Sequence, residues 1–257
     1  MSAIHPTAIV HSGARVGDGV EIGPYCVVGA DAVIGVGARL MAHVVVDGHT
    51  TIGPRATIFP FASIGTQTQD LKFRGGAPRV EIGEGTTLRE YVTVNAATND
   101  GGVTRVGASC HIMAYAHVAH DCVVGDEVII ANCGTLGGHV AIEDRAILGG
   151  LSGVHQFVRI GTLAIVGGCS KVVQDIPPYM MADGHPLAIP GINSVGLKRR
   201  GVGEEAQRAL KTAHRILYRS GLSTRQAIAR LEAEVPPLPE VRRLVDFILA
   251  SERVITH

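Results

Sequence analysis

An aliphatic residue recurs at every sixth position along most of this chain, and this period restricts the fold more than any other feature. The period holds through residues 4–64, resumes through 82–94 and continues through 106–172. Six matches neither the 3.6-residue period of a helix nor the two-residue alternation of a strand. It predicts a solenoid whose coil is a triangular prism of three short strands, one hexad on each face. The residues in phase are Ile4, Val10, Val16, Ile22, Val28, Ile34, Leu40, Val46, Ile52, Ile58, Ile64, Ile82, Leu88, Val94, Val106, Ile112, Val118, Val124, Ile130, Leu136, Ile142, Leu148, Val154, Ile160, Val166 and Val172.

The composition agrees with a thin aliphatic core. Aromatic residues make up 4% of the chain, there is no Trp, and 33 residues are Gly. We expect the aliphatic residue of each hexad to point inward, and successive coils to stack at about 4.8 Å, the ordinary distance between strands. A small residue four positions after the aliphatic one should pack beside it, as at Ala8, Ala38, Thr50, Ala56 and Ala62.

Two polar, Gly-rich segments interrupt the period and are typical of loops that leave the solenoid, at about 65–81 and 96–105. Their lengths do not reveal whether a face of the prism is skipped. The period ends after Val172, where Pro177 and Pro178 are expected to stop ladder pairing. We therefore expect a β-helix over residues 1–190 and a helical domain over residues 191–257.

The carboxyl-terminal part changes to a helical period. An apolar stripe from Ala206 to Leu217, stopped at Gly221, predicts a first helix. Ser223 and Gln226 have the spacing of a capping box and predict a second helix, ending near Ala233. A proline-rich segment separates it from a third helix with apolar residues between 241 and 249. Three amphipathic helices would cover the open end of the solenoid and its unpaired strand edges.

The overall charge and the cysteines exclude several classes of protein. The chain carries 23 basic and 23 acidic residues, which gives no global reason to expect binding to nucleic acid or to a membrane surface. No segment approaches the roughly 18 apolar residues of a transmembrane span, and the amino terminus lacks the pattern of a secretory signal. The five cysteines are scattered and include no CxxC pair. We expect a soluble, cytoplasmic protein with reduced thiols.

Histidines concentrate in the middle of the repeat. Val118, Leu136 and Val154 are three hexads apart, so their hexads lie on one face of three consecutive coils. The strings VAHDCV, LGGHVA and VHQFVR then place His120, His139 and His155 outward on one wall, within roughly 5 to 10 Å of each other. His117 ends the preceding hexad, beside this face. Since no packing requirement explains these imidazoles, we expect a functional site.

His120 and Asp121 are the strongest catalytic candidates. A carboxylate raises the basicity of an imidazole and fixes its tautomer, which suits a general base near neutral pH. Neighbouring residues of a strand point in opposite directions, so this pairing requires a turn, and Asp121 can equally be a simple turn residue. A free backbone amide in Gly137-Gly138 can stabilise an oxyanion, or the two glycines only shape a turn.

Six strings resemble the UDP-N-acetylglucosamine 3-O-acyltransferase family, whose members catalyse the first step of lipid A synthesis. The resemblance spans the whole chain and is highly specific in combination. It implies a left-handed β-helix, a hand that the period alone does not give. It also implies transfer of a 3-hydroxyacyl group from acyl carrier protein to a UDP-amino sugar. The strings are QDLKFRGG (69–76), AHVAHDC (116–122), GGHV (137–140), VHQF (154–157), GGCSKVVQDIPPY (167–179) and GLKRRG (196–201).

The resemblance implies a role for each matching residue. His120 would remove the proton from the sugar 3-hydroxyl, Asp121 would orient His120, and the Gly138 amide would stabilise the oxyanion. Gly168 would set the acyl-chain length, unless it is only a turn glycine. Lys198, Arg199 and Arg200, with Arg74, would meet the acidic surface of acyl carrier protein. The residues implied to bind the nucleotide sugar or the acyl group are Gln69, Asp70, Lys72, His117, His139, His155, Gln156, Asn193, Arg199 and Arg200.

The family also implies a homotrimer with sites between subunits, and neither a metal nor an organic cofactor. A triangular prism offers one flat face to each neighbour, so three copies can close a ring. Lys72, on the first loop, would supply a point charge for the diphosphate. Without the motif, the same residue would be an ordinary solvated lysine.

The chain departs from the family pattern at two places. Asn95-Ala96-Ala97 stands where a basic His-Arg-Gly string is usual, and Val195 replaces an acidic residue. Both places are expected near the sugar pocket, so a 3-amino UDP-sugar is an alternative acceptor, giving an amide in place of an ester.

Other functions compete with this interpretation. A sister N-acyltransferase usually has an extra domain before the repeats, whereas hexads begin here at Ile4. A small acetyltransferase using acetyl-CoA would not need the QDLKFRGG loop or the helical end. A zinc carbonic anhydrase on the same solenoid would hold its ion with three histidines across a subunit interface, and the candidates are His111, His117, His120 and His139. A structural scaffold would not explain the grouped histidines.

Overall fold

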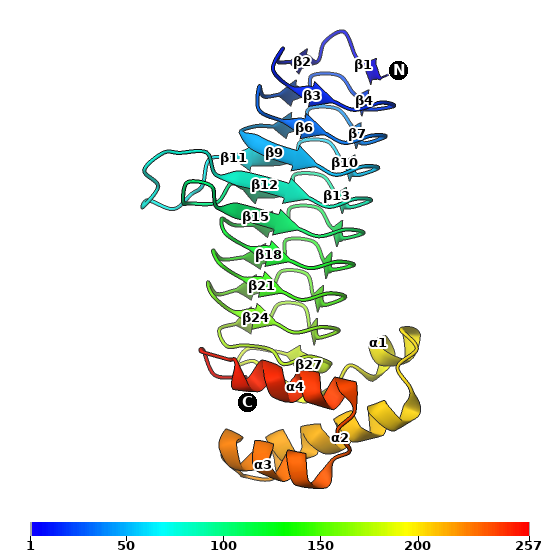
Figure 1. Ribbon diagram of the computed structural model, residues 1–257, viewed down its shortest axis with the longest axis vertical. Helices are drawn as coiled ribbons and strands as arrows, with labels where there is room; N and C mark the ends of the chain where they lie inside the picture. Colours follow the sequence, from blue (N-terminus) through cyan, green and yellow to red (C-terminus); the bar gives the residue numbers. More distant parts are fainter. Residues whose placement is uncertain (1, 257) are drawn as a thin grey trace.

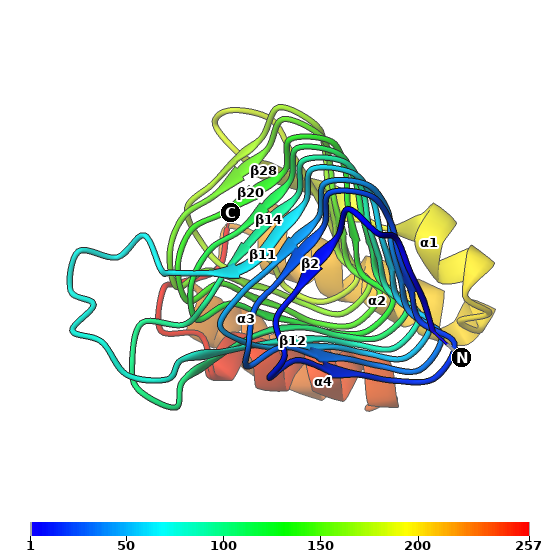
Figure 2. The same ribbon diagram turned by 90° about the horizontal axis from the view of Figure 1, so that it is seen from above.

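The strands of this protein lie on the three sides of a triangular prism, as the computed structural model of residues 2–256 shows (Figure 1, Figure 2). We call the three sheets face A, face B and face C. Face A contains β1 (Ala3–Ile4), β4 (Glu21–Ile22), β7 (Arg39–Leu40), β10 (Thr57–Ile58), β13 (Thr87–Leu88), β16 (His111–Ile112), β19 (Ile129–Ile130), β22 (Ile147–Leu148), β25 (Ile165–Val166), β27 (Met180–Asp183) and β28 (Ala188–Ile192).

The other two faces complete each coil. Face B contains β2 (Ile9–Val10), β5 (Val27–Val28), β8 (Val45–Val46), β11 (Ser63–Thr66), β14 (Thr93–Asn95), β17 (His117–Val118), β20 (Thr135–Leu136), β23 (Gly153–Val154) and β26 (Lys171–Val172). Face C contains β3 (Arg15–Val16), β6 (Val33–Ile34), β9 (His49–Ile52), β12 (Arg79–Ile82), β15 (Val103–Val106), β18 (Val123–Val124), β21 (Ala141–Ile142) and β24 (Arg159–Ile160). The prediction of a β-solenoid with one hexad on each face is confirmed.

Each short strand turns its second residue into the prism. Ile52, Ile58 and Ile64 are completely buried, as are Ala56 and Ala62 of the small-residue position. Burying an aliphatic side chain of this size contributes about 1.5 to 3 kcal/mol, and the repeat supplies such a side chain on almost every face.

Close stacking of the coils explains why Gly often follows the aliphatic residue. A Cβ at Gly35 would lie 2.6 Å from the backbone nitrogen of Pro54 in the next coil. No side chain fits at that distance, so the ladder spacing itself requires glycine there.

Both extruded loops leave the prism where face B meets face C. The first connects β11 to β12 and the second connects β14 to β15, so neither loop skips a face. They cover residues 67–78 and 96–102, and both project to one side in Figure 2. The predicted bounds of 65–81 and 96–105 were wrong at their edges, because β12 and β15 begin early and pair Arg79 with Val103.

The chain does not leave the solenoid at the two prolines. Pro177 and Pro178 lie at a corner, where no ladder hydrogen bond is needed, and β27 then pairs in parallel with β25. β28 returns antiparallel to β27. The prediction that pairing ends after Val172 was therefore wrong.

Four helices follow, α1 (Ser194–Arg199), α2 (Glu204–Arg219), α3 (Thr224–Glu234) and α4 (Pro239–Leu249). The last three match the predicted helices, and Ser223 and Gln226 form the predicted capping box. α1 was not predicted, since six residues are too few to show a helical period. The helices pack against the last coil (Figure 1): the Arg159 guanidinium lies 4.2 Å from the centre of the Phe247 ring. No helix in residues 2–256 is long and apolar enough to cross a membrane.

Candidate active site

Two of the predicted histidines, His120 and His139, meet at the corner between faces B and C, which we call the B–C corner. Its turns cover residues 119–122, 137–140 and 155–158 in three successive coils. The third residue of each turn has a left-handed backbone, with φ of 59° at Asp121, 61° at His139 and 65° at Phe157. The His139 ring stacks on Phe157 with centroids 4.6 Å apart and meets the His120 ring edge-on at 5.2 Å.

His120 and Asp121 form the predicted pair. Nδ1 of His120 lies 2.9 Å from Oδ2 of Asp121, and both side chains are mostly shielded, with exposures of 14% and 13%. In a strand the side chains of two neighbouring residues would point in opposite directions. The left-handed backbone at Asp121 makes a turn here, which lets the two side chains meet. An ionised carboxylate only accepts hydrogen bonds, so Nδ1 carries the proton and Nε2 keeps the lone pair. This is the arrangement that a general base requires.

Two threonines that the sequence did not single out extend this pair. Oγ1 of Thr98 lies 3.0 Å from Nδ1 of His120, and the Thr98 amide donates to Oδ2 of Asp121 at 3.1 Å. Thr98 also contacts the hydroxyl of Thr68 at 3.2 Å. The second loop is therefore bonded to the candidate base, and the first loop is bonded to the second. Thr98 and Thr68 lie outside the six-residue period, which left no signal for them.

Gly138 lies directly against the imidazole of His120. A Cβ at this position would be 3.0 Å from Nδ1 and closer still to Cε1 and Nε2, so the ring occupies the space of a side chain. The neighbouring Gly137 amide donates to Val154 at 2.9 Å, whereas the Gly138 amide makes no hydrogen bond within residues 2–256. A free N–H beside a basic nitrogen suits an oxyanion.

His117 was expected at the corner beside the other histidines. It lies instead on face B, in β17, just before the turn of residues 119–122. Its Nδ1 is 2.7 Å from the hydroxyl of Thr93. Burial, together with the nearby His120, lowers the pKa of His117. The ring is therefore held neutral, which suits a hydrogen-bonding role near neutral pH.

Cys122 is excluded as a nucleophile despite its place two residues from His120. Its side chain points into the core, and the thiol donates to the Gly137 carbonyl at 3.1 Å. Burial raises the pKa of this thiol to about 12. Since the thiolate is the reactive form, a Cys-His nucleophilic mechanism does not fit the corner.

Some predicted binding residues lie at the same corner but apart from the pair. His155 and Gln156 are two coils further along, where Arg253 from the carboxyl-terminal segment lies 3.0 Å from Nδ1 of His155. Gln69, Asp70 and Lys72 are on the first loop. The Asp70 carboxylate accepts the Lys72 amide at 2.9 Å.

Other predicted residues lie at different corners. Arg199 and Arg200 are in or beside α1, and Arg200 pairs with Glu127 where face C meets face A. The amide of Asn193 is buried and caps α1, accepting from the Gly196 amide at 2.9 Å. Gly168 lies where face A meets face B, with an ordinary φ, and a Cβ there would be 3.3 Å from the Gly150 carbonyl. A left-handed turn therefore does not explain this glycine.

The residues that depart from the family pattern are also placed. Asn95, Ala96 and Ala97 are buried, and the Asn95 amide donates to the Gln67 carbonyl at 3.1 Å. Through this bond Asn95 supports the base of the first loop. Val195 is 62% exposed on α1.

One set of possible metal ligands occurs among residues 2–256: His120, Asp121 and His139, whose ligand atoms all lie within 4.8 Å of one another. His111 is on face A, and its hexad does not reach this corner. Within residues 2–256 of one chain, the structure thus brings His120 and His139 together and leaves His111 away from them.

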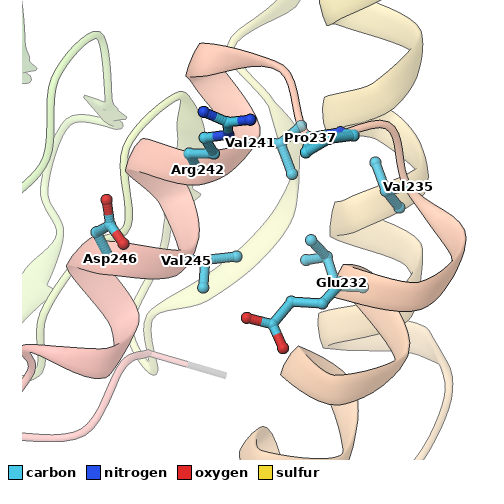
Figure 3. A pocket seen from close by; sticks show the side chains of 8 residues that line it. Glu232, Val235, Pro237, Val241, Arg242, Val245 and Asp246 are labelled. Atoms are coloured by element: carbon cyan, nitrogen blue, oxygen red, sulfur yellow. The ribbon is translucent and has the colours of Figure 1, made fainter.

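A separate pocket of about 340 Å³ lies between α3 and α4, lined by Glu232, Val235, Val241, Val245 and Asp246 among others (Figure 3). Histidine and cysteine are absent from its lining. This pocket shares no residue with the B–C corner.

Comparisons with known proteins agree with this geometry. A family described as "Udp N-acetylglucosamine O-acyltransferase; Domain 2" matches residues 175–256, and "Bacterial transferase hexapeptide (six repeats)" matches residues 104–138. An acyl-[acyl-carrier-protein]–UDP-N-acetylglucosamine O-acyltransferase of Thiobacillus denitrificans is 51% identical over 196 residues, which are 76% of each chain.

Solved structures extend the likeness over the whole chain. A UDP-N-acetylglucosamine acyltransferase of Bacteroides fragilis is 41% identical, with a TM-score of 0.97 over 99% of this chain and 100% of that one. LpxA of Acinetobacter baumannii is also 41% identical, with a TM-score of 0.95 over 99% of both chains. The protein belongs to the family of acyl-[acyl-carrier-protein]–UDP-N-acetylglucosamine O-acyltransferases.

Proposed function

We propose that this protein transfers a (3R)-3-hydroxyacyl group from acyl carrier protein to the 3-hydroxyl of UDP-N-acetylglucosamine, the first step of lipid A synthesis. The observation that carries the proposal is the contact between Nδ1 of His120 and Asp121, with Nε2 left free beside the unbonded amide of Gly138. Base and oxyanion donor are thus adjacent, as acyl transfer from a thioester requires.

The reaction follows from these positions. Nε2 of His120 takes the proton of the sugar hydroxyl while that oxygen attacks the thioester carbonyl. The negative charge on the carbonyl oxygen is stabilised by the Gly138 amide. Collapse of the intermediate breaks the C–S bond, and the proton on His120 passes to the departing thiolate of the phosphopantetheine arm. Asp121 keeps Nδ1 protonated throughout and stabilises the imidazolium. No organic cofactor or metal takes part in these steps.

The acceptor is a hydroxyl in this proposal, because the names of the relatives specify an O-acyltransferase. A 3-amino UDP-sugar remains the alternative that the same base would accept. Within residues 2–256 the buried side-chain oxygen of Asn95 has no hydrogen-bond partner, which favours a neighbouring substrate group rich in hydrogen-bond donors, such as an amine.

The active unit is a homotrimer with sites between subunits. Within one chain, His120 lies where face B meets face C, whereas Arg199 and Arg200 lie near the corner between faces C and A, and Gly168 lies between faces A and B. A substrate touching all of these residues needs a second copy. The first loop supports this, because it projects from the prism (Figure 2) and its residue Leu71 is 94% exposed.

The remaining assignments follow from the same proposal. The coil is left-handed, the β-helix domain covers residues 1–190 and the helical domain covers residues 191–257. Arg74, Lys198, Arg199 and Arg200 provide positive charge for acyl carrier protein. The cysteines, free thiols in the structure, support a cytoplasmic location.

The test is a competition between acceptors. The protein is incubated with 3-hydroxyacyl carriers of several chain lengths and an equal mixture of UDP-N-acetylglucosamine and its 3-amino analogue, and the products are identified by mass spectrometry. We expect mainly the 3-O-ester. A dominant amide would favour the amino sugar, and absence of both products would overturn the proposal.

A further inference from the structure

The catalytic pair and its neighbour on the next coil also form a possible set of metal ligands. His120, Asp121 and His139 offer two imidazoles and a carboxylate, with ligand atoms within 4.8 Å of one another. Oδ2 of Asp121 lies 2.9 Å from Nδ1 of His120 and 3.7 Å from Nε2 of His139. Zn²⁺ takes this combination of donors, with metal–ligand distances near 2.0 to 2.2 Å, and the separations of 2.9 and 3.7 Å are comparable to those between two ligands of one such ion.

The surroundings hold these groups in place. The His139 ring is stacked on Phe157 with an interplanar angle of 4°, and the Asp121 carboxylate is fixed by the Thr98 amide at 3.1 Å. His139 is the most exposed of the three, at 34%, so an ion can reach the set from solvent and keep water as its remaining ligand. Three protein ligands with one open position are typical of accessible zinc sites.

We propose that a soft divalent cation of the Zn²⁺ class binds at His120, Asp121 and His139 and inhibits the enzyme. A neutral imidazole has one lone pair in the plane of its ring. The reaction needs this lone pair to take the sugar proton, and a metal ion needs it as well, whichever ring nitrogen becomes the ligand. Metal-bound His120 therefore cannot act as the base. The inhibition part of this inference rests on the proposed function, whereas the metal site itself does not.

The experiment has a binding arm and an activity arm on the full-length protein. Calorimetric titration with Zn²⁺, without substrates, should show one saturable site per chain. His139→Gln and Asp121→Asn should each weaken binding by at least ~10-fold, since changes even outside the ligand shell commonly cost 10- to 100-fold. His11→Gln, which alters an exposed histidine of the first coils, is the matched control and should bind like the wild type. Mg²⁺, which prefers oxygen ligands, should not compete.

In the activity arm, Zn²⁺ should abolish acyl transfer at the concentrations that fill the site, and EDTA should restore it. The inference is overturned if no saturable binding occurs, if both variants bind as tightly as the wild type, or if bound Zn²⁺ leaves transfer unchanged or increases it. A metal-free protein without transferase activity would instead refute the proposed function, and the binding arm would still decide the metal site.

Discussion

The imidazole of His120 occupies the volume that a side chain at Gly138 would need, so the ring can lie against the Gly138 backbone only because no Cβ is present. We predict that Gly138→Ala displaces the ring and slows turnover by about 10²-fold, because a shift of about 1 Å in a catalytic group has that cost. Gly191→Ala is the matched control, since a Cβ there meets no atom within 4 Å. Equal activity of both variants would show that the contact does not matter.

Thr98 should act as a positioning residue. Thr98→Val removes the hydroxyl between His120 and Thr68, and the loss of a hydrogen bond worth about 1 kcal/mol should lower kcat/KM roughly fivefold. Thr98→Ser keeps the hydroxyl and should retain most of the activity. The pH profile of kcat/KM separates this role from general destabilisation: it should shift in Thr98→Val and not in Thr98→Ser.

Glu127 should link stability to pH. Hydrogen bonds from Arg145 and then Arg200 lower the pKa of this carboxyl below its ordinary value. A carboxyl whose pKa is lower in the folded state than in the unfolded state stabilises the fold at pH values above its unfolded-state pKa, which is near 4.5. This contribution disappears as the pH falls through the folded-state pKa. Glu127→Gln should therefore be less stable than the wild type at pH 7 and nearly equal to it at low pH.

Denaturant unfolding at fixed protein concentration measures this difference. The effect should be small, because the group is close to solvent, and it should shrink at high salt. A difference that grows as the pH falls would contradict the assignment.

Gly168 should set the length of the acyl chain. Its backbone does not require glycine, so Gly168→Met should fold and place a flexible apolar side chain on the outside of the corner. We predict that the ratio of kcat/KM for short over long acyl donors rises by about 10-fold or more, given that one methylene is worth about 1 to 3 kcal/mol in an apolar pocket. An unchanged ratio would leave Gly168 as a turn residue.

Much of the fold could be predicted because one hexad corresponds to one face. The register of Val118 and Leu136 alone predicts that His120 and His139 lie in adjacent coils, and the pairing of β17 with β20 confirms it. The proposed pairing of His120 with Asp121 required a turn, and the left-handed backbone at Asp121 supplies it.

The features that the sequence did not predict lie outside the six-residue repeat. Thr98 belongs to a loop whose path depends on tertiary contacts. The hexad pattern therefore does not predict its hydrogen bond to His120. Pro177 and Pro178 were expected to end the strand pairing, but both lie at a corner, where their missing N–H groups cost no ladder hydrogen bond. α1, which Asn193 caps, was not predicted because its six residues are too few to show a helical period.

The most direct test of the account is the turnover of His120→Gln with a 3-hydroxyacyl carrier and UDP-N-acetylglucosamine. Glutamine retains hydrogen-bonding capacity but cannot take a proton, so the change removes the base while leaving a partner for Asp121 and Thr98. We predict that turnover falls by about 10²- to 10⁴-fold, the usual contribution of general base catalysis, with the oligomeric state unchanged in light scattering. Turnover near that of the wild type would contradict the account.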